Sequence, residues 1–205
     1  MKYLLIVVTF LTLAQWPLSL HQTNSYKDII NDAGNYRHSS IIAPDDQAPL
    51  IINTKRSLYS SDFLGRFFNN KASFIWGRFK SNFFALIDPN NYFFGFHPRE
   101  IIRENLNIDK FPFISLIFLL YGLFRIDQLK WGKKLLGLFF ISVAILSLGR
   151  FDKVDFVLYP ILAYFIVSGI VLLKREKPRA FLISSLFLII FSIPQYLRAF
   201  VNLHS

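Results

Sequence analysis

The chain of 205 residues contains no cysteine. That absence excludes disulfide bonds, cysteine nucleophiles, thiolate metal sites and thiol redox chemistry. The four histidines (His21, His38, His97 and His204) are scattered and show no metal-ligand spacing. We therefore expect no cofactor and no metal site from the sequence. A divalent metal stays open only where another segment would complete an active site.

Charged residues are also scarce, at 18% of the chain, whereas soluble domains carry about 25%. Hydrophobic residues make up 53%, with 24 phenylalanines, and the formal net charge is +10. A basic balance is typical of nucleic-acid-binding proteins, but those proteins place Lys and Arg in a stripe on a soluble module. No such stripe is present here, so we expect no nucleic-acid partner.

Long runs of the C-terminal half have no charged residue in their interiors. These runs are 111–126, 135–149, 154–173 and 180–197. A soluble helix of this length would carry a polar stripe, whereas a bilayer core needs roughly 20 apolar residues per helix. The pattern predicts a four-helix transmembrane bundle over residues 111–205. Interior ionisable groups would mark a transport pathway, and their absence disfavours transport.

Residues 1–20 form a further apolar segment, with Lys2 ahead of it. This segment is either a signal anchor that stays as the first transmembrane helix or a signal peptide that is cleaved. Counting it as a helix, the fold class is an all-α integral membrane protein with about five transmembrane helices and one long exported loop.

The short connecting turns differ in charge. Turns 125–134 and 174–179 each carry a net charge of +3, whereas turn 150–155 is neutral. Turns rich in Lys and Arg stay cytoplasmic, and they have affinity for anionic lipid. The rule predicts a cytoplasmic N-terminus, with residues 21–110 and the C-terminus outside. An exported loop without disulfides favours the cell or plasma membrane of a prokaryote.

The exported loop, residues 21–110, has two parts. Residues 21–56 are polar and rich in turn residues, and Leu50–Asn53 is expected to be a short extended piece. From about residue 57 to residue 85, Phe and Trp recur at helical spacing with basic residues and asparagines between them. This pattern predicts amphipathic helices that lie in the plane of the membrane interface. The alternative is a helix packed on a soluble core.

A polar segment follows an aromatic cluster after the Asp88-Pro89 turn. An arginine fork binds phosphate oxygens in pairs, and polar groups beside aromatic rings at a membrane face suit a lipid phosphate. The candidate phosphate-binding residues are Arg78, Lys80, His97, Arg99 and Arg103, with Arg150 from the outer turn. The alternative is that Arg99 and Arg103 pair with Glu100 and Glu104 at the start of an interfacial helix.

Several short stretches have the order seen in one glycosyltransferase family. They are Asn69-Asn70-Lys71, Lys80-Ser81-Asn82-Phe83-Phe84, Asp88-Pro89, Tyr92-Phe93-Phe94-Gly95, Lys110-Phe111-Pro112 and the stretch 150–160. Residues 57–173 thereby resemble the central loop and following helices of lipid-linked-sugar glycosyltransferases of the dolichyl-phosphate-mannose protein mannosyltransferase type, which have the GT-C fold.

The resemblance implies the C-terminal half of such an enzyme. That family carries its catalytic carboxylate in the first exported loop, usually within an acidic pair. This chain offers Asp28, Asp32 and the pair Asp45-Asp46 there, and the candidates are Asp45 and Asp46. The implied function is binding of a polyprenyl-phosphate-linked sugar without independent catalysis, with a partner subunit carrying the catalytic half. The alternative is a noncatalytic membrane scaffold or partner subunit of another role. Whether the chain is an enzyme stays open at this point.

Overall fold

The computed structural model describes residues 1–22, 41–42, 47–58, 62–94, 110–149 and 154–204, and every regular element in them is a helix. The order is α1 (Lys2–Gln22), α4 (Gln47–Ser57), α5 (Asp62–Phe68), α6 (Lys71–Ile87), α7 (Asn90–Phe93), α8 (Ser115–Phe124), η1 (Ile126–Gln128), α9 (Gly132–Leu146), η2 (Val154–Leu158), α10 (Tyr159–Glu176) and α11 (Pro178–His204). The all-helical expectation is confirmed for this part of the chain.

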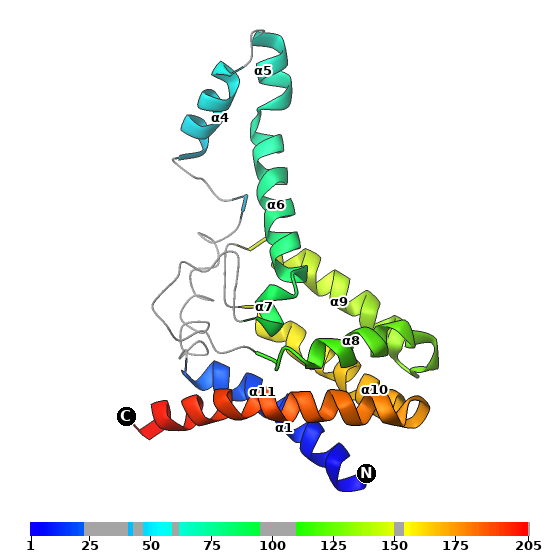
Figure 1. The fold of residues 1–205 in the computed structure, drawn as a ribbon. Helices are drawn as coiled ribbons and strands as arrows, with labels where there is room; N and C mark the ends of the chain where they lie inside the picture. The colour runs from blue at the N-terminus through cyan, green and yellow to red at the C-terminus, as the bar shows by residue number, and fades with distance from the viewer. Residues whose placement is uncertain (23–40, 43–46, 59–61, 95–109, 150–153, 205) are drawn as a thin grey trace.

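Helix α10 lies at the centre of a bundle and contacts α8, α9, α11 and α1 (Figure 1). Its inward positions are apolar at helical spacing, so one helix supplies side chains to several neighbours. Fully buried members of the core come from several helices. They include Val8 of α1, Phe118 of α8, Val143 of α9, Phe165, Ile166 and Ile170 of α10, and Phe181 and Leu188 of α11.

The closest pair in the bundle is α8 with α10, and two glycines make the approach possible. A Cβ atom at Gly169 would lie 1.9 Å from the carbonyl oxygen of Phe118. A Cβ atom at Gly122 would lie 2.3 Å from the carbonyl oxygen of Phe165. The two backbones therefore touch directly, as small residues allow between helices in membranes.

The bundle helices alternate in direction between two ends. Figure 1 shows α1, α9 and α11 running one way, and α8 and α10 running the other. The turns from α8 to α9 and from α10 to α11 lie at one end, with the N-terminus on the same side. Helices α6 and α7 lie toward the other end, as does the C-terminus. The two basic turns thus lie together, away from α6 and α7.

One segment of the described residues, Phe156–Glu176, is long and apolar enough to cross a membrane by length and composition, and 56% of it is buried against other helices. Shorter apolar stretches occur in three other helices. They are Lys2–Gln15 in α1, Ser115–Phe124 in α8 and Pro178–Pro194 in α11. The expectation of about five transmembrane helices therefore goes further than helix length and hydropathy establish.

Helices α4, α5 and α6 form an arm that projects from the bundle (Figure 1). Helix α6 runs across the direction of α10 and α11. The expectation of an extended piece at Leu50–Asn53 is wrong, because these residues lie inside α4. Pro49 falls in the first turn of that helix, where a proline costs no internal hydrogen bond.

Helix α6 is defined sharply at its start and is attached near its end. The backbone N–H of Ser73 donates to the Asn70 side chain, and the Asn70 N–H donates to Ser73 Oγ, both at 2.9 Å, which makes a capping box. Near the other end, Asn82 Nδ2 donates to the carbonyls of Ser147 (3.1 Å) and Gly149 (3.0 Å) at the end of α9. These bonds fix the base of the arm on the bundle.

Candidate functional site

Two of the predicted phosphate-binding residues, Arg78 and Lys80, lie on α6. The other predicted site residues lie outside the described part of the chain. They are Asp45, Asp46, His97, Arg99, Arg103 and Arg150. The described part of the predicted site therefore lies on the arm.

Arg78 and Lys80 lie on different sides of α6. The Arg78 guanidinium lies 4.4 Å from the centroid of the Phe74 ring, one helical turn earlier, and the side chain is half-buried. Lys80 is exposed, and it is four residues from both Trp76 and Phe84, which are also exposed. Residues at this spacing share one helix face. The outward face of α6 therefore alternates a cation with aromatic rings.

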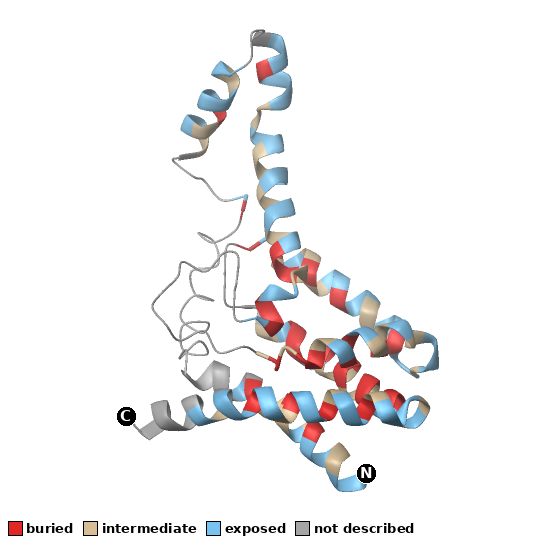
Figure 2. Cartoon of the chain, viewed as in Figure 1, coloured by how far each residue is buried: buried red, intermediate tan, exposed pale blue. Residues whose placement is uncertain are grey.

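Aromatic rings continue along the arm in contact with one another. On α6, Trp76 stacks on Phe79 with centroids 5.3 Å apart, and Phe79 stacks on Phe83 at 5.9 Å. On α5, the ring of Phe63 stacks on Phe67 at 6.3 Å, and both side chains are exposed. Figure 2 shows that most of the arm is exposed, whereas the buried residues gather in the bundle. In the part of the arm that the structure describes, Phe83 is the only one of these rings that packs against the buried core of the bundle.

The charge of the arm is strongly positive. Residues 47–87 carry six basic side chains and one acidic side chain, a net charge of +5. Basic side chains extend their charged ends to the water while their stems cover apolar surface. A helix with exposed rings and cations is the type that lies on anionic membrane surfaces. No group of His, Asp and Glu able to hold a metal ion occurs in the described residues.

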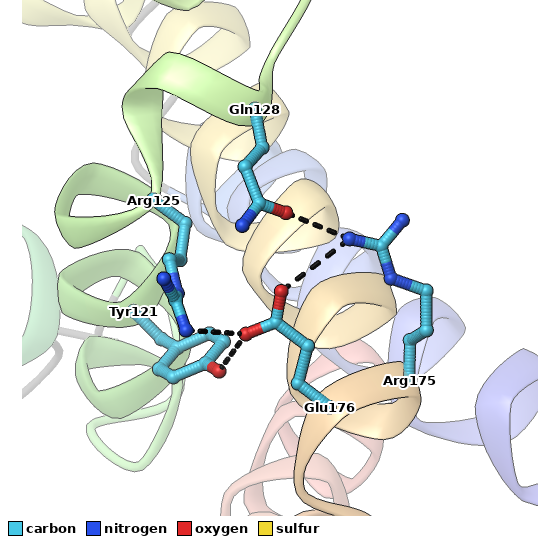
Figure 3. Close-up of polar contacts among 5 residues, drawn as sticks. All are labelled: Tyr121, Arg125, Gln128, Arg175 and Glu176. Carbon is cyan, nitrogen blue, oxygen red and sulfur yellow. Dashed lines mark hydrogen bonds and ion pairs between the residues drawn. The ribbon is translucent and has the colours of Figure 1, made fainter.

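A second polar site joins α8 to α10, and the sequence analysis did not foresee it. The Tyr121 hydroxyl donates to Glu176 Oε2 at 2.6 Å, and Arg125 Nη2 lies 2.9 Å from the same oxygen (Figure 3). Arg175 Nη2 donates to Gln128 Oε1 at 2.7 Å and lies 3.4 Å from Glu176 Oε1. We refer to Tyr121, Arg125, Gln128, Arg175 and Glu176 as the end cluster.

Both carboxylate oxygens of Glu176 have partners within the end cluster. The hydrogen bond with Tyr121 and the charge of Glu176 raise the pKa of Arg125 above its ordinary value. Nearby, Lys133 Nζ lies 2.7 Å from Asp127 Oδ1, and this contact raises the pKa of Lys133. The available sequence signal was that Glu176 is the lone acid among the four basic residues of turn 174–179.

The comparisons with known proteins give no identity. No protein-family model, curated protein or solved structure matches the chain. The relationship to lipid-linked-sugar glycosyltransferases therefore stays a prediction. The chain itself carries a cationic aromatic arm at one end of a helical bundle and a polar cluster toward the other end.

Proposed function

We propose that this chain is a polytopic membrane protein whose arm binds lipid phosphate at the extracytoplasmic surface of the membrane. Helices α1, α8, α9, α10 and α11 would cross the bilayer, with the N-terminus in the cytoplasm. The segment 21–110 and the C-terminus would lie outside. In this arrangement the two basic turns face the cytoplasm, as short turns rich in Lys and Arg do.

The bundle surface supports this placement. Several large apolar side chains of α9 and α11 are exposed. They are Leu138, Phe140, Ile141, Ile145, Leu182, Ile183, Leu186, Phe187, Ile190, Phe191 and Ile193. A water-exposed patch of this kind marks an interaction surface, and lipid tails would cover it without further protein. Helices α8 and α9 are shorter than the bilayer core is thick. Local thinning of the bilayer and flanking interfacial side chains would accommodate this difference.

The observation that carries the proposal is the direction of α6. This helix runs across α10 and α11 at the side of the bundle away from the basic turns (Figure 1). If α10 crosses the bilayer, α6 would lie parallel to the membrane at the extracytoplasmic surface of the bilayer. There the exposed Trp76 and Phe84 would enter the interface, and Lys80 and Arg78 would reach the phosphates.

The resemblance suggests the lipid. We propose that the arm holds the phosphate of a polyprenyl-phosphate-linked sugar and that the chain does not catalyse sugar transfer on its own. A partner subunit would then supply the catalytic carboxylate. The rival function is a noncatalytic membrane scaffold, which would contact general lipids through the same arm.

Membrane placement can be tested by cysteine labelling, because the chain has no cysteine to remove. Ala72→Cys on the arm, at an exposed position beside the capping box, should react with an impermeant maleimide added to intact cells. Lys177→Cys in a basic turn should react only after the membrane is permeabilised. Labelling of both positions from the outside would overturn the five-helix arrangement.

Phosphate binding can be tested by retention of polyprenyl phosphate on the purified protein, measured by native mass spectrometry. Replacing both cations of α6 (Arg78→Gln with Lys80→Gln) should reduce retention several-fold. The matched control is Lys55→Gln with Lys71→Gln, which removes the same charge from other places on the arm. Equal retention by both double variants and the unmodified protein would reject the phosphate site and favour the scaffold.

A further inference from the structure

The two basic turns of the bundle form one continuous surface in the folded chain. Arg175 Nη2 reaches Gln128 Oε1 at 2.7 Å, and Arg125 reaches Glu176 at 2.9 Å (Figure 3). Residues 125–134 and 174–179 are 40 positions or more apart in the sequence, and the end cluster joins them. Together they carry eight basic and two acidic side chains, a net charge of +6.

Both acidic side chains of this surface are already paired. Asp127 Oδ1 lies 2.7 Å from Lys133 Nζ. Glu176 Oε2 accepts a hydrogen bond from the Tyr121 hydroxyl and forms an ion pair with Arg125. Within the described residues, the remaining lysines and Arg179 have no carboxylate at ion-pair distance. These cations are Lys130, Lys134, Lys174, Lys177 and Arg179. Their charge has no counterion from the described chain.

Trp131 marks the level at which this surface would meet the lipid. Its side chain is 50% exposed in the turn before α9. Lys134 Nζ lies 5.1 Å from the indole centroid and Lys130 Nζ lies 5.9 Å from it, so two ammonium groups flank one ring. Tryptophan rings sit at the headgroup level of a bilayer. The two lysines are thereby held where phosphates would lie.

We infer that the joined basic turns, centred on Lys130, Trp131 and Lys134, are a binding surface for anionic phospholipid headgroups. The occupant follows from charge complementarity, because unpaired cations beside an interfacial tryptophan attract phosphodiesters at the membrane surface. The surface lies away from the arm, so the protein would hold lipid phosphate at both faces of the membrane. This inference rests on the membrane placement proposed above.

The test uses Trp131 as a local probe of lipid composition. A variant with Trp16→Phe and Trp76→Phe retains Trp131 as its single tryptophan. It is placed in bilayers of phosphatidylcholine and phosphatidylglycerol whose composition is constant, with bromine on the chains of one lipid or the other. We expect brominated phosphatidylglycerol to quench Trp131 several-fold more strongly at equal mole fraction. The excess should decline as salt is added.

A charge-matched pair of variants locates the effect. Lys130→Gln with Lys134→Gln should bring the two quenching values to equality, and the ratio cancels any change in the brightness of Trp131. Lys55→Gln with Lys71→Gln removes two charges from the arm and should leave the excess unchanged. Equal quenching in the single-tryptophan protein, or an excess that survives in the Lys130 and Lys134 variant, would overturn the headgroup site. Absence of quenching by either lipid would reject the membrane placement as well.

Discussion

The arm and the α8–α10 pair use similar aromatic and basic residues in opposite ways. In the pair, Phe118 and Phe165 are buried, the backbones touch at two glycines, and the charged groups are bonded to one another at the helix ends. On the arm, Phe63 and Trp76 are exposed, and Gly77 has no atom within 4 Å of its Cβ position. Composition alone therefore does not separate a core from a surface.

This difference shows what each region depends on. The pair is stabilised by contacts within the chain, so changes to it should alter the stability of the fold. Beyond its base, where Asn82 and the buried Leu86 attach α6 to the bundle, the arm has few such contacts. Changes to its surface should therefore alter membrane association and leave the fold intact. The same kind of substitution in the two regions can test this contrast.

Large effects of opposite sign are expected from one substitution made at two glycines. Gly169→Ala would place a Cβ atom 1.9 Å from a backbone oxygen of α8, so the two helices must separate. Overpacking costs about 1–3 kcal/mol, and a clash with backbone should reach or exceed the upper end. Gly77→Ala meets open space and should stabilise α6 by roughly 0.5–1 kcal/mol. Thermal unfolding in detergent measures both.

The attachment of the arm should give the next largest effect. Asn82→Ala removes two hydrogen bonds to the carbonyls of Ser147 and Gly149, which should cost about 1–2 kcal/mol. The angle between α6 and α9 should also vary more widely. Distances between spin labels at Ala72→Cys and Leu138→Cys measure this, with the exposed Asn90→Ala as the control. An unchanged distance distribution would mean that other contacts hold the arm.

The end cluster should contribute less, and its contribution should depend on salt. Glu176→Gln removes the charge that meets Arg125 across α8 and α10. We expect a modest fall in Tm that shrinks at high ionic strength. Asp127→Asn breaks the exposed pair with Lys133 and should leave Tm unchanged. A larger loss in Asp127→Asn than in Glu176→Gln would contradict the assigned role of the cluster.

The smallest effect on folding is expected on the outward surface of the arm. Phe63→Ala removes a ring that is largely exposed, so stability in detergent should change by less than about 0.5 kcal/mol. Phe165→Ala removes a buried ring of α10 and is the reference for a core loss, which should cost about 3–5 kcal/mol. Tm values of the two variants measure the difference. Equal losses would mean that the arm is folded against the rest of the chain.

Much of the architecture was predictable from local sequence. The apolar runs near 111–126, 135–149, 154–173 and 180–197 correspond to α8, α9, α10 with η2, and α11. Helices α5 and α6 lie within or close to the predicted region 57–85. Helical spacing and hydropathy are local properties, so these positions can be read without the fold. Helix α4 was missed because residues 21–56 are polar and rich in turn residues, although Pro49 lies in the first turn of a helix that begins at Gln47.

The end cluster was not predictable. Tyr121 and Glu176 are 55 residues apart, and neither belongs to a motif with a recognised spacing. Of the predicted phosphate site, Arg78 and Lys80 lie on one helix, but on different sides of it. Which side faces water depends on how α6 attaches to α9, and that contact joins residues distant in sequence.

The sequence by itself determined the helical class, the positions of the apolar segments and the basic charge of the turns, because each follows from neighbouring residues. Only the tertiary structure decided which helices touch, through Gly122 and Gly169. It also decided that the two basic turns meet and that α6 runs across the bundle. These features depend on contacts between side chains and backbones that are far apart in the chain, and a local sequence pattern does not predict such contacts.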